Sequence, residues 1–340
     1  MEEKVLPEYW RSTIEDLEDT LKLVKKGTVK QVGVSAGKRP IYKIEYGKSN
    51  IKLGRANLSS ALGARDIKCF ADKTGEDYVP TLFLCGSVHG GEFEGTMALL
   101  NLIKLMETGT DYAGVEHPEL LSLMEKIHLV LIPIANPDGR SRVPYRSVVG
   151  MSFEEFRYYD QGTWKNGELC GWTGCKTIHP IKDECEFLGA YFNDDGVNMV
   201  HEDFFGKVSN ESTALLDVCR YDAPDLTIQL HGGTNALSGI VPTEYSSEQN
   251  VEKCNTLANA VKAVCEAEGI PCAAYKVGVM NTAFGITGAM YHVSGAPAVT
   301  FESNQGLDYG KVICTYDQIY RSHILLFEES AKFVLATKVK

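Results

Sequence analysis

The sequence predicts an α/β fold: a single domain with a mixed, mostly parallel twisted sheet that has helices on both faces. Four short apolar runs lack alternating polar residues, as strands buried on both faces do. These runs are residues 79–85, 128–134, 226–230 and 298–301. Helical stretches separate or follow them, at 93–106, 249–268 and 316–337. Strands that alternate with helices favour a sheet covered on both sides.

The sequence gives no sign of a second domain. A chain of 340 residues is long enough for about two domains. However, it contains no internal repeat, no low-complexity segment and no linker rich in Pro, Gly or Ser. We therefore interpret residues 1–340 as one domain.

The first 46 residues predict one helix and one hairpin. Between residues 7 and 26, apolar side chains recur at spacings of three and four, which is typical of a helix. The β-rich runs 29–34 and 41–46 flank a turn at 37–40 that contains Gly and Pro. This pattern predicts two paired antiparallel strands.

Composition and charge narrow the class of protein. Hydrophobic residues make up 44% of the chain and charged residues 23%, as in ordinary globular proteins. The formal net charge is −11, and no basic run is present. An acidic chain of this kind is a poor partner for a phosphate backbone, so nucleic-acid binding is disfavoured.

Export and membrane signals are not evident. The first residues lack the positive segment and apolar core of a signal peptide. The stretch 277–301 contains no Asp, Glu, Lys or Arg, but glycines, a proline, Asn281 and His292 interrupt it. We interpret it as buried loop and strand, not as a membrane span. The ten cysteines are then expected to be reduced thiols of a cytoplasmic protein, although a secreted protein lacking its leader stays open.

Polar side chains follow each of the four predicted core strands. His89 and Glu92 come after the first strand, Asn136 after the second and His231 after the third, and Glu302 ends the fourth. Ligands of open α/β sheets bind beyond the carboxyl ends of the strands. A lone histidine or glutamate at such a position is more often structural, but several convergent polar groups indicate a site.

Three of these residues have the chemistry of zinc ligands. His89 and Glu92 are three residues apart at the start of a predicted helix, so they share one face of it. His231 arrives from a different strand end. Two histidines and one glutamate leave the fourth zinc position open for water, as in catalytic sites. We therefore expect one zinc ion per chain, held by His89, Glu92 and His231.

The set resembles the carboxypeptidase A-like zinc metallopeptidases. The resemblance is carried by His89-Gly90-Gly91-Glu92, by His231 at 139 residues after Glu92, and by Glu302 a further 71 residues on. It extends to the early turn 35–41 and to Asn136-Pro137-Asp138-Gly139, and covers about residues 9–327. It implies a zinc hydrolase that cleaves an amide bond in a peptide, with Glu302 as the general base and acid.

The substrate-binding pattern of the family is altered. The family has an Asn-Arg pair that binds the C-terminal carboxylate of the substrate, and here the pair either falls on Val200 and His201 or is displaced. No arginine lies between Arg157 and Arg220, so a bidentate guanidinium clamp is missing at this position. The aspartate that orients the first ligand histidine is Asn198 in this chain.

Other family positions are harder to assign. The aromatic–arginine pair Tyr145-Arg146 resembles the family's Trp-Arg, so Arg146 is our candidate for stabilising the transition state, with Arg142 second. The substrate-side tyrosine would fall near Met280, and Tyr275 or Tyr291 are substitutes. His201, Asn198, Arg142 and Tyr291 are thus the candidate substrate-binding residues.

The segment 146–195 is long for this family, and we interpret it as an inserted rim segment. It holds Cys170, Cys175, His179 and Cys185, whose spacing fits no standard zinc motif. A structural metal site is one interpretation. A rim of packed thiols and aromatic side chains, which narrows the cleft and sets specificity, is favoured.

The prediction is a zinc metallopeptidase, carboxypeptidase-like but with an atypical carboxylate anchor. One alternative is an N-acyl amino acid deacylase like aspartoacylase or succinylglutamate desuccinylase, which also use H-G-x-E. A second is a non-catalytic binding protein on the same fold. Without the arginine, amidation of the substrate carboxylate is expected to cost little, unless Lys165, Lys176 or His179 compensates.

Overall fold

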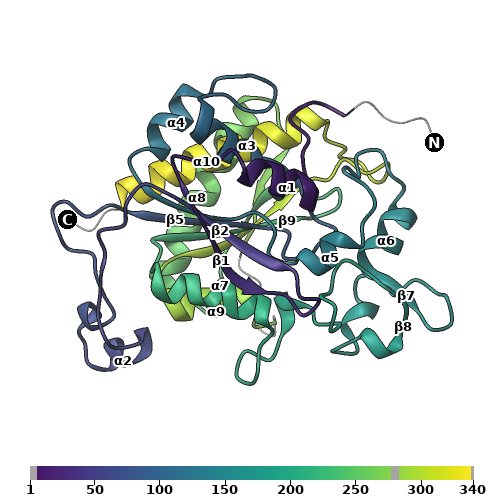
Figure 1. The fold of residues 1–340 in the computed structure, drawn as a ribbon, viewed down its shortest axis with the longest axis horizontal. Coiled ribbons are helices and arrows are strands. Elements are labelled where there is room, and N and C mark those ends of the chain that lie inside the picture. Colours follow the sequence, from purple (N-terminus) through teal and green to yellow (C-terminus); the bar gives the residue numbers. More distant parts are fainter. Residues whose placement is uncertain (1–5, 277–282, 338–340) are drawn as a thin grey trace.

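Eight strands form the central sheet of the computed structural model, which describes residues 6–276 and 283–337 (Figure 1). Their order across the sheet is β1-β2-β6-β5-β9-β12-β10-β11. The strands are β1 (Thr28–Val34), β2 (Pro40–Tyr46), β5 (Thr81–Gly86), β6 (His128–Ile132), β9 (Leu226–Gly232), β10 (Ser238–Val241), β11 (Cys272–Ala274) and β12 (Ala298–Ser303). Two small sheets pair β3 (Lys52–Leu53) with β4 (Ala71–Asp72), and β7 (Gly162–Trp164) with β8 (Cys185–Leu188).

The sheet is mixed and mostly parallel. Strands β6, β5, β9 and β12 run parallel to one another in its centre. The hairpin β1–β2 joins β6 antiparallel at one edge, and β10 joins β12 antiparallel near the other. The predicted core strands and the predicted hairpin are therefore confirmed, and the carboxyl ends of the parallel strands meet at one edge.

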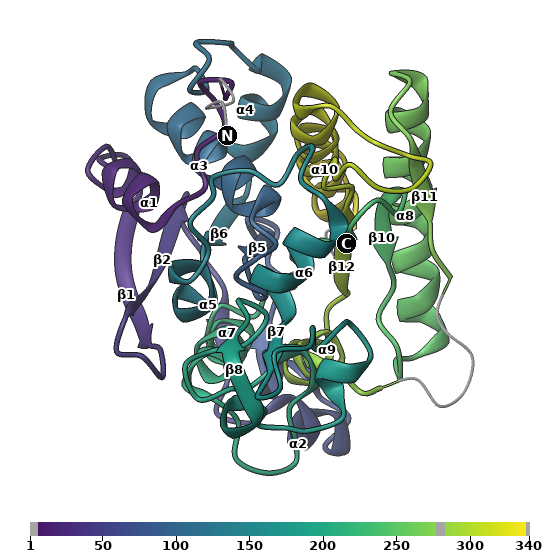
Figure 2. The ribbon, with the colours of Figure 1, turned by 90° about the vertical axis from the view of Figure 1, so that its right-hand side faces the viewer.

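Helices cover both faces of the sheet (Figure 2). On one face, α3, α8 and α10 pack on the strands, with α1 against α3 and α4 against α10; α7 and α9 lie on the other face, with α2 beside α9. The helices are α1 (Ile14–Leu21), α2 (Leu58–Gly63), α3 (Glu94–Thr108), α4 (Pro118–Met124), α5 (Pro137–Ser141), α6 (Phe153–Gln161), α7 (Asn210–Tyr221), α8 (Glu248–Ala267), α9 (Ile286–Ser294) and α10 (Tyr316–Ala336). No helix among the described residues is both long and apolar enough to cross a bilayer.

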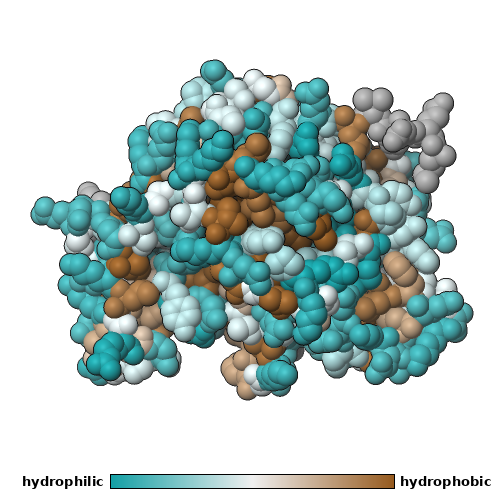
Figure 3. All heavy atoms as spheres, viewed as in Figure 1, coloured by the Kyte–Doolittle hydropathy of each residue, from teal (hydrophilic) through white to brown (hydrophobic). Residues whose placement is uncertain are grey.

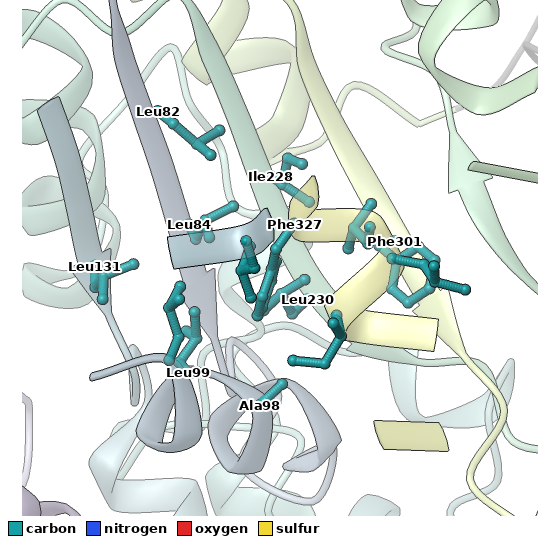
Figure 4. Packing of buried hydrophobic residues seen from close by; sticks show 14 of the residues in the cluster. Leu82, Leu84, Ala98, Leu99, Leu131, Ile228, Leu230, Phe301 and Phe327 are labelled. Atoms are coloured by element: carbon teal, nitrogen blue, oxygen red, sulfur yellow. The ribbon is translucent and has the colours of Figure 1, made fainter. Parts of the chain in front are cut away.

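The core strands are apolar throughout because each face of the sheet has its own core. Leu82 and Leu84 of β5 pack with Leu99 of α3 and Phe327 of α10 (Figure 4). The intervening Phe83 lies in a second core, with side chains of α7 and α9. Burying one such side chain contributes roughly 1.5–3 kcal/mol. Hydrophilic side chains cover most of the outer face that carries α1 and β1 (Figure 3).

The first helix is shorter than predicted. It begins after Thr13, whose side chain forms a capping box with Asp16, and it ends at Leu21. Before it, Trp10 leaves the helical path to bury its ring edge-on against Tyr316. After it, the carboxylate of Glu107 accepts backbone N–H groups of residues 25–27. Tertiary contacts therefore override the helical periodicity at both ends.

The uncharged stretch 277–301 was expected to be loop and strand, and it also contains helix α9. Residues 277–282, Met280 among them, lie outside the described part. The sequence of α9 includes Gly288 and β-branched residues, which have weak helix propensity. Burial of Ile286 and Met290 against the second core stabilises the helix instead.

The early turn and the Asn-Pro-Asp-Gly motif contact each other. Asp138, at the start of α5, is buried and accepts hydrogen bonds from the Ser35 hydroxyl (2.6 Å), the Gly37 N–H (2.8 Å) and the Arg39 guanidinium (2.8 Å). It also accepts the Asp194 N–H at 3.1 Å. Burial alone would raise the pKa of Asp138, but these donors hold it below its usual range.

We expect Asp138→Asn to destabilise the protein by about 2–3 kcal/mol at pH 7, because several hydrogen bonds to one carboxylate are lost. The pKa of Asp138 is lower in the folded state. Its stabilisation is therefore present at neutral pH and is lost as pH falls below about 3.9, the value for an unfolded aspartate. Urea unfolding of this variant and of Asp195→Asn, which alters an exposed neighbour, measures the difference. Equal midpoints would contradict it.

Candidate active site

The candidate site lies where β5, β9 and β12 end side by side. In the parallel pairing of β9 with β12, His231 is directly opposite Glu302. Gly86, the last residue of β5, pairs with Leu230 of β9. His89 and Glu92 follow in the short connection from β5 to α3. The sheet register thus brings together the four residues that the sequence selects.

His89, Glu92 and His231 converge on one point. The Glu92 carboxylate lies between the two imidazoles, with Oε1 2.9 Å from His89 Nδ1 and Oε2 2.8 Å from His231 Nδ1. The three ligand atoms lie within 4.8 Å of one another, and all three residues are buried. Among the described residues, no other group of three or more His, Cys, Asp or Glu side chains is placed to hold a metal ion.

The connection after β5 folds tightly to present these side chains. Ser87 has a left-handed φ of 47°, which turns the chain sharply, and its hydroxyl donates to the Glu92 carbonyl at 3.3 Å. At Gly90, a Cβ atom would lie 2.2 Å from the Arg140 backbone nitrogen. Only glycine therefore allows α5 to approach this turn so closely.

The other ring nitrogen of each histidine has its own partner. His89 Nε2 lies 3.2 Å from the Asn198 side-chain oxygen, and His231 Nε2 lies 3.3 Å from that of Gln229. With Nε2–H donating to these amides, both Nδ1 atoms are free to bind a metal. The His89 ring also stacks on Tyr191, with centroids 3.5 Å apart. Asn198, a candidate substrate-binding residue, thus contacts His89 and is not among the residues that line the cleft.

The donor set fits zinc. Two imidazole nitrogens and one carboxylate, each oriented by a neighbouring group, are the protein ligands of a catalytic zinc site. Burial lowers the pKa of His89, whereas the Glu92 carboxylate raises that of His231 in spite of burial. The two imidazoles hold the pKa of Glu92 well below its usual range, although burial opposes them. The carboxylate is therefore ionised and ready to bind a cation.

Glu302 faces the same site from β12. It lines the cleft together with His89 and His231, and it is partly exposed there. Burial raises the pKa of its carboxyl to about 7, with Glu92 adding to the rise and His231 opposing it. A dication bound beside it would lower this pKa. A carboxylate that lies beside the candidate ligands without being one of them is suited to accept and return a proton.

The cleft in front of these residues has a volume of about 700 Å³. The predicted rim segment 146–195 forms part of its wall through Trp172, Lys176 and Tyr191, and the remaining wall comes from several other elements. Those other lining residues are His89, Val200, His201, His231, Val241, Glu244, Ala283, Thr300 and Glu302. The segment 146–195 therefore shapes part of the cleft wall.

Several predicted site residues lie outside this lining. The Arg146 guanidinium is half-exposed and lies 3.3 Å from Asp16 of α1. Arg142 pairs with Asp194 and donates to backbone carbonyls of Gly189 and Phe192. The Tyr291 hydroxyl donates to Ser247, and Tyr275 to the Leu237 carbonyl. These side chains thus have partners elsewhere, and none of them is among the residues that line the cleft.

His201 does line the cleft, and Lys176 lies beside it. Lys176 Nζ is 3.1 Å from His201 Nε2. Sequence reasoning named Lys176 only as one of three cations in a long segment. The sequence predicts aromatic side chains in the rim, but it does not single out Trp172 and Tyr191 as residues that line the cleft. The length of the segment 146–195 was the sequence feature that pointed to a rim, but a length does not predict which side chains line the cleft.

The four residues Cys170, Cys175, His179 and Cys185 do not form a metal site in the described structure. Cys170 and Cys175 are buried in a small core with Ile181, Tyr191 and Phe192, and partly buried Cys185 packs against it. His179 Nε2 accepts the Asn198 backbone N–H at 2.9 Å. The favoured interpretation, a rim of packed thiols and aromatics, agrees with this arrangement.

We expect His89→Ala and His231→Ala each to lose most of the bound zinc, because each removes one of three ligands. Metal analysis of the purified variants measures zinc per chain. His292→Ala, which removes an exposed histidine from α9, is the matched control and is expected to keep its zinc. Full retention of zinc by either ligand variant would remove that residue from the set.

Comparisons with solved structures agree with the fold. The chain is similar to a metallo-carboxypeptidase from Burkholderia cenocepacia, with a TM-score of 0.57 and 14% identity over 96% of this chain and 68% of that one. It is also similar to bovine thrombin-activatable fibrinolysis inhibitor, with a TM-score of 0.57 and 13% identity over 97% of this chain and 99% of that one. A third similar structure is carboxypeptidase A from Helicoverpa armigera, with a TM-score of 0.55 and 14% identity over 98% of this chain and 77% of that one. Identities this low establish the fold alone.

The sequence itself identifies the family. No curated protein sequence matches the chain. The family model described as zinc carboxypeptidase matches residues 20–312, which contain all three candidate ligands and Glu302. Because this match spans most of the chain, the protein belongs to the zinc carboxypeptidase family and is a zinc metallopeptidase.

Proposed function

We propose that this protein hydrolyses an amide bond in a peptide-like substrate, as a carboxypeptidase-like enzyme with an atypical carboxylate anchor. One observation carries the proposal: His89, His231 and Glu302 line a single cleft, and the buried Glu92 carboxylate lies between the two histidines. Three of these residues are placed to hold zinc, and Glu302 is a carboxylate outside the candidate ligand set. A binding protein would have no need to keep this complete set.

Each of these residues has its own role in the proposed hydrolysis. His89, Glu92 and His231 would hold the zinc ion, which would supply a Lewis acid for the scissile carbonyl and the attacking water. Glu302 accepts the proton of the attacking water and delivers it to the leaving nitrogen. Asn198 and Gln229 keep the two imidazoles in the tautomer that presents Nδ1.

The anchor for the substrate differs from that of the family. By the resemblance, His201 stands at the position of the family's arginine. Burial and the neighbouring Lys176 lower the pKa of His201 to about 4, so its imidazole is neutral at pH 7. A neutral imidazole cannot replace a bidentate guanidinium as the counter-ion of a carboxylate. Another group must hold the substrate, or its carboxylate is not recognised.

A deacylase of the same broad architecture is the second candidate, because it also uses the H-G-x-E ligand pair. The contact of the turn at 35–40 with Asp138 favours the peptidase, since both motifs belong to that branch and depend on each other here.

Kinetics on two sets of substrates distinguish the candidates. We expect the zinc-loaded protein to cleave N-blocked di- and tripeptides with a kcat/KM well above that for N-acetyl and N-succinyl amino acids. Release of free amino acid measures both sets in one assay. The reverse preference would make the protein a deacylase. No turnover of either set would favour a binding role.

We expect Glu302→Gln to bind zinc normally and to lose about 10²–10⁴-fold in kcat, because an amide cannot move the proton. Glu244→Gln removes the other carboxylate that lines the cleft and controls for the loss of a negative charge. Its loss is expected to be much smaller. Activity of Glu302→Gln within a few-fold of the unmodified protein would mean that another group transfers the proton.

A further inference from the structure

A lysine from the rim segment projects into the cleft. Lys176 ends a short 3₁₀ turn (Gly174–Lys176), and its half-buried side chain lines the cleft with His201 and Trp172. The ammonium lies 4.4 Å from the centroid of the Trp172 ring and 6.0 Å from that of Tyr191. These contacts hold the nitrogen at the wall of the same cleft that Glu302, His89 and His231 line.

The partners of this ammonium in the described structure are all neutral. Its Nζ donates to the His201 imidazole at 3.1 Å, and the two aromatic rings offer cation–π contact. Neither Glu244 nor Glu302, which line the same cleft, forms an ion pair with it within the described residues. By contrast, Arg142 of the same segment is paired with Asp194.

A partly buried charge without a counter-ion is costly. Removing an ammonium from water carries a penalty that only an opposite charge or several hydrogen bonds offset. Burial lowers the pKa of Lys176, which reflects this cost, while the fields of Glu92 and Glu302 favour the charged form. One hydrogen bond and two aromatic faces leave further donor capacity on the ammonium. An anionic ligand in the cleft would satisfy it.

We propose that Lys176 is the carboxylate anchor of the cleft and selects substrates that carry a carboxylate next to the scissile bond. The inference rests on the proposed hydrolase function. The neutral His201 positions the ammonium by accepting a hydrogen bond from it, and the Trp172 ring packs against it. An ammonium is a point charge, so the anchor recognises charge with less directional control than a guanidinium fork. This assignment replaces the expectation that amidation costs little.

The main experiment compares a matched pair of peptides, free acid and C-terminal amide, with a neutral last residue. We expect the unmodified protein to prefer the acid by about 10- to 150-fold in kcat/KM, the worth of a charge-assisted hydrogen bond. Lys176→Met should bring the ratio of acid to amide close to one. Lys176→Arg, which keeps the charge, should retain a preference. Lys165→Met removes an exposed lysine from the same segment and is expected to keep the full ratio.

Three outcomes would overturn the proposal. If Lys176→Met loses equal activity on acid and amide, Lys176 acts at the reacting carbonyl or on folding. Zinc content and circular dichroism distinguish these two explanations. An unchanged ratio in Lys176→Met would mean that another cation holds the carboxylate. If the protein instead prefers amidated peptides that contain Glu over those that contain Gln, Lys176 binds a side-chain carboxylate of the substrate and not its terminal one.

Failure of the underlying function is recognised separately. If the zinc-loaded protein cleaves neither peptide, calorimetry with the same acid and amide still tests the anchor. Tighter binding of the acid, lost in Lys176→Met and kept in Lys165→Met, supports the anchor in a protein that does not hydrolyse peptides. Equal binding of acid and amide would overturn the anchor whether or not the protein is a hydrolase.

Discussion

The site depends on three parallel strands that end at the same level. Because β9 lies between β5 and β12, a residue at the end of β9 is the immediate neighbour of residues from both sides. His231 therefore reaches Glu92 on one side and lies opposite Glu302 on the other. A shift of one residue in either pairing would turn His231 or Glu302 to the opposite face. The apolar cores on both faces of the sheet fix this register.

Around this centre, the chain supplies supports of two different origins. Asn198, Gln229 and the turn at Ser87 belong to the body of the fold and set the orientation of the ligands. Tyr191, Trp172 and Lys176 belong to the rim segment, which has its own small core of thiols and aromatics. Tyr191 joins the two, because its ring stacks on His89 and packs within that small core. The wall of the cleft is therefore fixed relative to the ligands.

The sequence predicted the structure correctly where an apolar run marks a buried strand and polar residues directly follow it. The four core strands, helix α3 and the ligand set follow from apolar runs with polar residues at their ends, and the structure places them as predicted. Helix α9 and the ends of α1 were missed because packing of Met290 and Trp10 decides them. No local pattern records such contacts.

The arginines show most clearly why substrate contacts resist prediction. Arg140, Arg142 and Arg146 follow the same motif within seven residues, and any of them has the chemistry to stabilise an anion. In the structure, Arg140 is buried over the Phe93 ring and donates to backbone carbonyls, Arg142 pairs with Asp194, and Arg146 lies beside Asp16. All three are used to join the N-terminal segment and the rim to the fold. A cation becomes available to a ligand only when the fold leaves it without a counter-ion, and that depends on long-range contacts. Lys176 meets this condition because its nearest partners are a neutral histidine and two aromatic rings.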